Sequence, residues 1–441
     1  MTSTHLLEAI ADADLVPRTG QVRRILPTFV EADGPWAARG AICTIETRPT
    51  VTTIGSALAE VVGVSPGSVV LAPFETGVAT FPGARVTALP QEDLAPVGAA
   101  FLGRVVDAFG RPIDGAGPVR ATARAALGGR ASPTLDRISS PAVLETGVRA
   151  IDGLLTLARG QRVGVFAASG VGKTSLMGQL ARQVEADCCV ICLVGERGRE
   201  VEALWSSGLS NEAKARTVLV AATSDEAAAM RVRAGDYALA LAEHWRSRGR
   251  HVLLLLDSVT RLAMAMREMG LAAGEPPTVR AYTPGVFAAI PRLVERCGAL
   301  RGGGAISAVM TVLSETDEID DPICEMMKSL LDGHIILARR LAEQGHFPAI
   351  DVPRSISRLS ARLLEEPQRK LADRALALLS TYEHSRTMIE TGVYVRGGSP
   401  QIDAAIEAQS GLTEFLRQRP DEHIPQAAAF QKLSGLLGGG A

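Results

Sequence analysis

Phe166-Ala-Ala-Ser-Gly-Val-Gly-Lys-Thr174 is the most informative segment of this chain. The apolar run Arg162–Phe166 before it predicts a strand, and apolar residues at helical spacing over 174–182 predict a helix after it. A strand, a glycine turn and a helix N-terminus together direct several backbone N–H groups and the positive end of a helix dipole at one point. That arrangement suits phosphate, so the stretch predicts a phosphate-binding loop.

Two side chains of this loop have expected roles. Lys173 would place a positive charge on the β- and γ-phosphates of a nucleotide, and the Thr174 hydroxyl would be a ligand of Mg²⁺. The full pattern requires Gly five residues before Gly172, where this chain has Ala167. Because Gly170 and Gly172 remain, the turn can still form. The alternative is an ordinary glycine-containing turn between a strand and a helix.

The composition is that of a globular chain with aliphatic cores. Of 441 residues, 46% are hydrophobic, 21% charged and 4% aromatic, and this length allows about three domains. The formal net charge is −2, which disfavours a nucleic-acid partner because such proteins usually carry a basic domain or stripe. Neither a membrane-spanning run nor a secretory signal is visible, so we expect a cytoplasmic protein.

Three of the six cysteines fall in the strand-like run Cys188–Val194. Cys189 and Cys192 form a C-x-x-C pair, but no second pair completes a zinc site. Strand alternation would place these two side chains on opposite faces of a sheet. A core role is therefore favoured, and the scattered histidines indicate no metal site.

The texture of the sequence predicts three structured parts. Residues 20–95 contain short β-branched runs separated by Gly, Pro and Asp, which indicates a small barrel or sandwich, and a glycine-rich connector follows over 103–115. From about 140 to 360, apolar strands alternate with amphipathic helices, which indicates a parallel sheet with helices on both faces. After about 365 the chain is helical, and residues 1–16 could form a short amphipathic helix. The expected strands are 162–166, 188–194, 217–222, 251–256, 305–313 and 333–338, and the expected helices include 173–185, 225–247 and 259–269.

Two acidic residues follow predicted strands directly, where ligands bind in open α/β sheets. Asp257 ends the run Val252–Asp257 and could make a water-mediated contact with Mg²⁺, although it could instead cap the helix that begins near Ser258. Glu196 follows strand 188–194 and could polarise a water for attack on a γ-phosphate, although it could equally lie in a charged surface turn.

Two arginines could add positive charge at a phosphoryl transition state. Arg197 adjoins Glu196 and could touch phosphate. Arg358, in the stretch Ser355–Arg358, is the candidate for an arginine inserted into the site. On composition alone, a solvated surface arginine is the commoner explanation of Arg358.

Taken together, these motifs resemble the catalytic ATPases of type III protein export, which are relatives of the catalytic subunit of rotary ATP synthases. The resemblance extends from about Gly103 to the 390s. The stretches that carry it are Gly147–Thr156, Gly160–Gly164, Gly195–Val201, Asp257–Arg261, Gly270–Pro277, Leu331–Ile335, His346–Asp351 and Ser355–Arg358.

The resemblance implies a role for each candidate residue. Glu196 would activate water, Arg197 would contact phosphate, and Arg358 would be an arginine finger acting on the nucleotide of a neighbouring subunit. Lys173 would take part in catalysis, and Thr174 and Asp257 would hold the metal of MgATP. The implied nucleotide-binding set is Ser169, Gly170, Val171, Gly172, Lys173, Thr174 and Ser175.

The resemblance also implies an architecture and partners. The fold class would be α/β: a RecA-like parallel-sheet core (96–365) with an N-terminal β-barrel (20–95), a C-terminal helical domain (366–441) and an N-terminal partner-binding segment (1–19). Six copies would form a ring with ATP at the interfaces, and Glu275–Pro277 would lie near its central channel. The implied partners are stator and stalk proteins of the export apparatus, chaperone-bound substrates and the export gate at the inner membrane, with no nucleic acid.

Two positions depart from the family's pattern. Relatives usually have Gly where this chain has Ala168; if that residue adopts a positive φ, Ala there would cost on the order of 1–2 kcal/mol. Leu313 stands where the ATP synthase subunit has a tyrosine, so the adenine pocket is left unassigned. The C-terminal runs Glu390–Pro400 and Ile402–Ile406 look more like the flagellar branch than the virulence injectisome branch.

Two other functions remain as alternatives. The chain could be a non-catalytic ring subunit that binds nucleotide, although such relatives usually lack the carboxylate found here at Glu196. It could also be a hexameric RNA translocase that shares the ATPase core. That class should show a basic or aromatic surface in residues 20–95, where Lys and Arg are not clustered.

Overall fold

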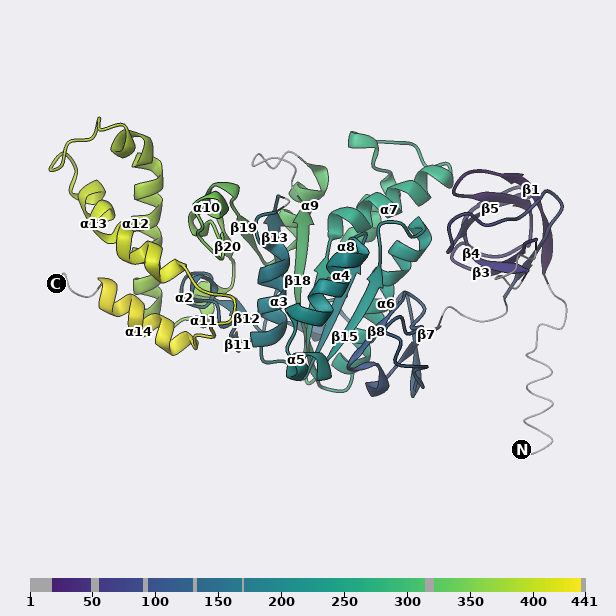
Figure 1. The fold of residues 1–441 in the computed structure, drawn as a ribbon, viewed down its shortest axis with the longest axis horizontal. Helices are drawn as coiled ribbons and strands as arrows, with labels where there is room; N and C mark the ends of the chain where they lie inside the picture. Colours follow the sequence, from purple (N-terminus) through teal and green to yellow (C-terminus); the bar gives the residue numbers. More distant parts are fainter. Residues whose placement is uncertain are drawn as a thin grey trace.

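The computed structural model describes residues 18–48, 55–89, 94–129, 133–168, 170–313 and 321–437. They form a β-barrel, an α/β core and a group of C-terminal helices, arranged in a row with the core in the middle (Figure 1). The α/β fold class predicted from the sequence is confirmed. The predicted helix over 1–16 and the phosphate-loop residue Ser169 lie outside the described residues.

The N-terminal barrel closes around alternating apolar residues. Cys43 and Ile45 of one strand and Ala59 and Val61 of the next point inward and are fully buried. The strands pair antiparallel in the order β1-β2-β5-β4-β3-β6, and β6 pairs with β1, so the sheet has no free edge. The strands are β1 (Thr19–Ile25), β2 (Val30–Asp33), β3 (Ile42–Glu46), β4 (Ser56–Ser65), β5 (Ser68–Pro73) and β6 (Arg85–Ala88).

The core sheet has the order β20-β19-β13-β18-β16-β14-β15-β8, and the strands from β19 to β8 run parallel. All six predicted strands are present. They are β13 (Arg162–Ala167), β14 (Cys188–Val194), β15 (Thr217–Ala222), β16 (His251–Asp257), β18 (Ala305–Leu313) and β19 (Gly333–Leu337). At one edge, β20 (Ile356–Ser357) pairs antiparallel with β19. Off this order, β17 (Gly298–Leu300) pairs antiparallel with both β10 (Arg137–Ile138) and the central strand β18.

The segment 103–115 is more than the predicted connector. Its residues Arg104–Val106 form β8, which pairs in parallel with β15 and becomes the far edge of the core sheet. Three residues are too few to show a period of two in the sequence, so the pattern could not identify this strand.

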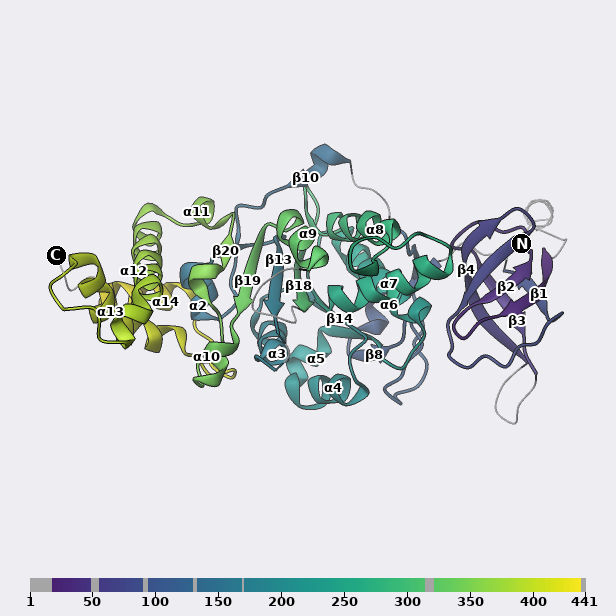
Figure 2. The same ribbon diagram turned by 90° about the horizontal axis from the view of Figure 1, so that it is seen from above.

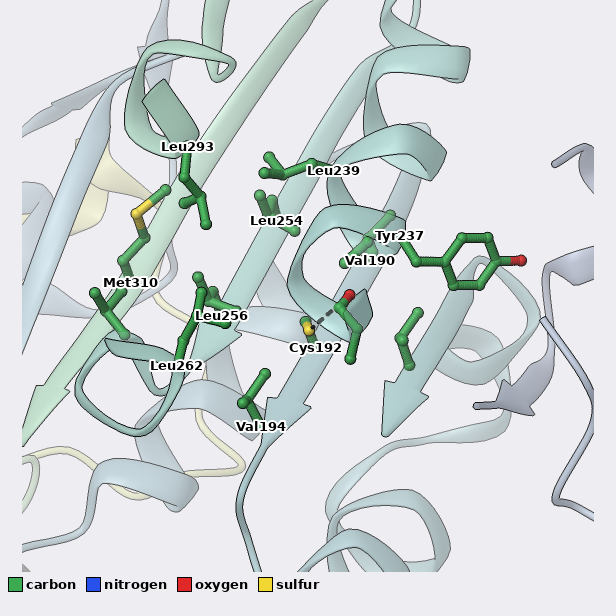
Figure 3. Packing of buried hydrophobic residues seen from close by; sticks show 14 of the residues in the cluster. Val190, Cys192, Val194, Tyr237, Leu239, Leu254, Leu256, Leu262, Leu293 and Met310 are labelled. Carbon is green, nitrogen blue, oxygen red and sulfur yellow. Dashed lines mark hydrogen bonds between the residues drawn. The ribbon is translucent and has the colours of Figure 1, made fainter. Parts of the chain in front are cut away.

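Both faces of the core sheet are covered, which explains the nearly continuous apolar strands. Val190, Cys192 and Val194 of β14 pack on one face against helix α6 (Figure 3), and Cys189 and Ile191 pack on the other. The prediction that Cys189 and Cys192 occupy opposite faces of a core strand is confirmed.

Each face of the sheet has its own helices, as Figure 2 shows from above. The face lined by Cys192 packs against α6 (Ala228–Arg246), α7 (Val259–Ala272), α8 (Pro284–Glu295) and α9 (Pro322–Leu330). The opposite face packs against α2 (Arg149–Leu154), α3 (Lys173–Gln183), α4 (Gly198–Ala203) and α5 (Asn211–Ala215). Short elements complete the core: β7 (Leu94–Val97), β9 (Ala123–Ala126), β11 (Val143–Leu144), β12 (Leu157–Ala158), α10 (Arg339–Glu343) and α11 (Ser360–Leu363).

The C-terminal helices extend the apolar core on the α2 and α3 side. They are α12 (Glu366–Glu390), α13 (Pro400–Leu416) and α14 (Gln426–Leu437). Phe415 and Phe430 are buried in the same cluster as Ile151 of α2. Across the described parts of the chain, no helix combines the length and the apolar character needed to cross a membrane.

Candidate active site

The phosphate-binding loop takes the backbone path that its glycines allow. It follows β13, and Gly172 is the N-cap residue of α3, with a φ of 94°. Gly170 has a φ of 82°, so both glycines lie in the left-handed region. The free N–H groups of the first turn of α3 therefore point into the loop, as expected for a phosphate site.

Ala168 is accommodated without the backbone cost considered above. Positive φ among the described non-glycine residues occurs at Arg280 and Ala281, and not at Ala168. The Ala168 side chain is buried against the core. The departure from the family's glycine therefore gives no reason to expect a strained loop.

Lys173 lies between two buried carboxylates. Its Nζ is 2.6 Å from Asp257 Oδ1 and 3.1 Å from Glu196 Oε1, and the three side chains are 12%, 4% and 6% exposed. Asp257 Oδ1 also accepts a hydrogen bond of 2.6 Å from the Thr311 hydroxyl. The ends of β13, β14 and β16 thus deliver the loop lysine and two acids to one point at the carboxyl edge of the sheet.

Asp257 does not cap α7, and Glu196 does not lie in an exposed turn. Ser258, and not Asp257, is the N-cap residue of α7, and its hydroxyl accepts a hydrogen bond from the Arg261 N–H. Glu196 is only 5% exposed, so it does not lie in a solvated surface turn. Both acids face the phosphate-binding loop.

Arg261 is a neighbour of the site that the sequence reasoning did not single out. Its guanidinium donates to the Gly195 carbonyl, and its Nε is 3.5 Å from Glu196 Oε1. Gly195 has a φ of 70°, and a Cβ there would come within 3.0 Å of the Arg261 side chain. The signal in the sequence was the position of Arg261 one helical turn after Asp257.

A cavity of about 740 Å³ adjoins the loop. The exposed residues Thr174 and Ser175 line it, together with Arg182 of α3 and the C-terminal segment Arg419–Asp421. Its size lies within the usual range for small-ligand sites. The pocket therefore lies between the core and the C-terminal helices.

Phe347 supplies an aromatic face at the same site. Its ring carbons lie 3.5 Å from where a Cβ on Gly172 would be, and 42% of the residue is exposed. Its carbonyl accepts the N–H of Gln418, whose side-chain amide is bonded to Gly147 and Arg149. Phe347 belongs to the stretch His346–Asp351, which carries part of the family resemblance, but no role was expected for it. The available signal was an aromatic residue followed by Pro in a chain with few aromatics.

The two candidate arginines lie apart from this cluster. Arg197 is exposed immediately before α4. Arg358 follows β20, and Ser357 pairs with Gly333, which is level with Val163 near the start of β13. The phosphate-binding loop begins after Ala167, about 13 Å farther along that strand. Arg358 thus lies at the opposite end of β13 from its own loop. It is exposed there.

Comparison with known proteins agrees with this geometry. Residues 147–357 match the model of the ATP synthase alpha/beta family nucleotide-binding domain, and residues 364–435 match that of the type III secretion EscN ATPase C-terminal domain. The flagellum-specific ATP synthase of Pseudomonas aeruginosa is 44% identical over 96% of this chain and 93% of its own length. The type 3 secretion system ATPase of Xanthomonas euvesicatoria is 40% identical over 99% of this chain and 98% of its own length.

The chain belongs to the family of flagellar and type III secretion ATPases. The assembled EscN ATPase of enteropathogenic E. coli, a solved structure, has the same fold with a TM-score of 0.88 at 36% identity, covering 95% of this chain and 99% of that one. EscN has also been solved in complex with its central stalk EscO. This export ATPase is therefore an ATP hydrolase of type III protein export.

Replacing Lys173 with Met should destabilise this export ATPase in the absence of nucleotide. Glu196 and Asp257 would be left buried without their cation, at a cost on the order of 3 kcal/mol. Thermal or denaturant unfolding measures the loss. Lys370→Met is the matched control, because Lys370 pairs at 2.7 Å with Glu366 on the surface, where both are more than 60% exposed; that variant should lose less than about 1 kcal/mol. Equal losses in both variants would contradict the prediction.

Proposed function

We propose that this export ATPase hydrolyses MgATP at the Lys173 site, as one of six subunits in a ring with a nucleotide at each interface. The observation that carries the proposal is the lysine of a phosphate-binding loop held between Glu196 and Asp257, both buried. Phosphoryl transfer needs a phosphate cradle, a metal, a group that orients water and added positive charge. Each has a candidate in this chain.

The nucleotide-binding part is residues 169–175. The loop N–H groups and Lys173 would hold the phosphates, and the oxygens of Thr174 and Asp257 would hold Mg²⁺, a metal that prefers oxygen ligands and commonly keeps only one or two from protein. Mg²⁺ would neutralise charge on the phosphates. Among the described residues there is no cluster of three or more acidic, Cys or His side chains suited to a metal, which agrees with a metal held mostly by nucleotide and water.

Glu196 is the proposed residue that activates water. Its carboxylate lies beside Lys173 and 3.5 Å from Arg261. When phosphate attracts Lys173, Glu196 becomes available to polarise the attacking water. Arg197, on the exposed side of the same turn, would contact phosphate.

Arg358 is proposed to act on the neighbouring subunit's nucleotide. Its place at the opposite end of β13 from its own loop leaves it unable to reach that loop's phosphates, whereas its exposure allows contact with another copy. A head-to-tail arrangement that repeats this contact closes into a ring. The non-catalytic alternative is disfavoured because Glu196 is present and in place.

The proposed setting is flagellar protein export. The ring would engage chaperone-bound substrates, promote their unfolding and deliver them to the export gate, working in the cytoplasm at the inner-membrane face. A stalk partner is supported by the EscN–EscO complex, and stator proteins are proposed from the family resemblance. An injectisome is the alternative setting, since relatives from both systems are 40–44% identical to this chain.

Arg358→Ala and Glu196→Gln should each remove activity alone and restore it when mixed. Each variant should lower kcat by roughly 10²- to 10⁴-fold. In rings formed from equal amounts, about one quarter of the interfaces pair an intact loop with an intact finger, because each comes from a different subunit. Steady-state ATPase assays on the separate proteins and on the mixture measure this.

The same mixture separates the two roles. A mixture no more active than its separate components would contradict a finger acting between subunits. Native turnover in Glu196→Gln alone would remove Glu196 from water activation. Glu196→Gln should still bind nucleotide, since this substitution preserves the shape of the site. A fluorescent ATP analogue measures that binding.

Phe347→Ala should weaken ATP binding while Phe347→Tyr should not. A purine base stacked on the exposed ring would contribute about 1–3 kcal/mol, which the tyrosine ring would preserve. The KM for ATP measures the effect and should rise roughly 5- to 100-fold for alanine. Equal KM values for the two variants would show that the ring does not carry the base.

Deletion of the gene should abolish swimming motility and secretion of flagellar components, and leave any injectisome secretion intact. Complementation with the native gene should restore both activities, and the Glu196→Gln gene should not. Motility plates and analysis of secreted proteins measure the outcome. Loss of injectisome secretion with normal motility would assign the protein to the alternative system.

A further inference from the structure

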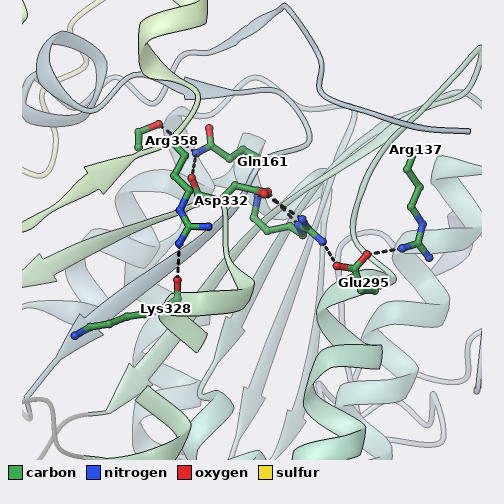
Figure 4. A network of polar contacts seen from close by, with 8 residues as sticks. Arg137, Gln161, Glu295, Lys328, Asp332 and Arg358 are labelled. Atoms are coloured by element: carbon green, nitrogen blue, oxygen red, sulfur yellow. Dashed lines mark hydrogen bonds and ion pairs between the residues drawn. The ribbon is translucent and has the colours of Figure 1, made fainter. Parts of the chain in front are cut away.

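A network of polar contacts begins at Arg162, the first residue of β13, at the opposite end of that strand from the phosphate-binding loop. Arg162 grips Asp332 with two parallel hydrogen bonds of 3.0 Å, and its backbone N–H donates to the same carboxylate at 3.0 Å. The Asp332 N–H in turn donates to the Arg162 carbonyl at 2.9 Å. Glu295 accepts a further bond of 2.7 Å from Arg162 and also binds Arg137 (Figure 4).

The network of contacts ends on Arg358. The Asp332 carbonyl accepts the backbone N–H of Arg358 at 3.0 Å, and the Arg358 guanidinium donates to the Lys328 carbonyl in the last turn of α9 at 3.1 Å. Gln161 bridges the two segments, because its amide donates to the Asp332 carbonyl and to the Ser357 hydroxyl. Figure 4 shows Arg358, Asp332 and Gln161 gathered at this end of the sheet. Arg358 is therefore an exposed residue whose backbone is held by Asp332 and whose guanidinium is held by Lys328.

We propose that Arg162 and Asp332 are positioning residues that hold Arg358 in place for the neighbouring subunit's nucleotide. The inference rests on the proposed role of Arg358 between subunits. Arg162 begins the strand whose other end leads into the phosphate-binding loop. One short strand thus connects a subunit's own nucleotide to the finger that it presents to the next, and a shift of the loop along β13 would be felt at Asp332.

The bidentate geometry suits positioning more than stability. A largely buried ion pair is weak evidence for stability, because desolvation offsets its attraction, and Arg162 and Asp332 are 19% and 28% exposed. Two parallel bonds fix the orientation of a planar guanidinium against a carboxylate. Catalysis is sensitive to placement, since a displacement of about 1 Å can change a rate roughly 100-fold.

The chain contains a matched control pair. Arg104 is the first residue of β8 and makes two parallel bonds of 2.7 and 2.8 Å to Asp114, which also accepts a backbone N–H from Val105 at 3.0 Å. These side chains are 15% and 10% exposed. The pair lies on β8, the edge strand of the same sheet that is farthest in the strand order from β20, which precedes Arg358. It reproduces the chemistry of the first pair without its connection to Arg358.

The test compares Asp332→Asn with Asp114→Asn in ATPase assays. We expect Asp332→Asn to lower kcat roughly 10- to 100-fold, with the KM for ATP within about twofold of native, because its own loop is intact. Mixed with Glu196→Gln subunits, it should regain activity as Arg358→Ala does. Asp114→Asn should lose as much thermal stability or more, yet keep native kcat.

Each remaining outcome decides against the inference. A native kcat in Asp332→Asn would overturn the inference. So would an Asp332→Asn protein that gains no activity when mixed with Glu196→Gln while Arg358→Ala does gain it, because Asp332 would then act within its own subunit. If Arg358→Ala also gains no activity in the mixture, the proposed action of Arg358 between subunits is wrong. The positioning role of Asp332 is then wrong as well. Should Asp332→Asn not fold, Arg162→Lys, which keeps the charge but not the fork, should show the same complementation to a smaller extent.

Discussion

The attraction between Lys173 and two buried carboxylates is the interaction on which the candidate site depends. Glu196 and Asp257 are both buried, and burying an acidic side chain without a partner is costly. Lys173 lies within hydrogen-bonding distance of both. The same amine is the group that a triphosphate would attract. Under the proposed function, nucleotide binding would exchange one set of anionic partners of Lys173 for another and would leave the two acids free to act on metal and water.

The parallel sheet explains why this cluster could be predicted from sequence. A parallel strand buried on both faces must be apolar along its length, so the first polar residue marks its end. Glu196 and Asp257 are such residues, and the carboxyl ends of parallel strands share one edge. The glycine loop identified that edge as a phosphate site. The pattern did not show whether Asp257 or Ser258 caps α7. In the structure the Ser258 hydroxyl caps the helix.

Contacts between residues distant in sequence could not be predicted in this way. Phe347 lies beside the loop, and its carbonyl accepts the N–H of Gln418, which follows α13; no local pattern links the two. Arg162 and Asp332 are likewise 170 positions apart. The φ of Ala168 was also open, because family preference for glycine does not fix the angle that an alanine adopts. Fold class follows from periodicity, whereas such contacts follow from packing, which periodicity does not encode.

The two ends of β13 lie at two different candidate sites of the subunit. The carboxyl end leads into the glycine turn that would receive the subunit's own nucleotide. At the amino end, the Asp332 carbonyl accepts the backbone N–H of Arg358, the residue proposed to act on the next subunit. A strand paired on both sides is a stiff element, so motion at one end is transmitted more than absorbed. A single strand that leads to both sites would therefore couple them in the proposed ring without a longer pathway through the core.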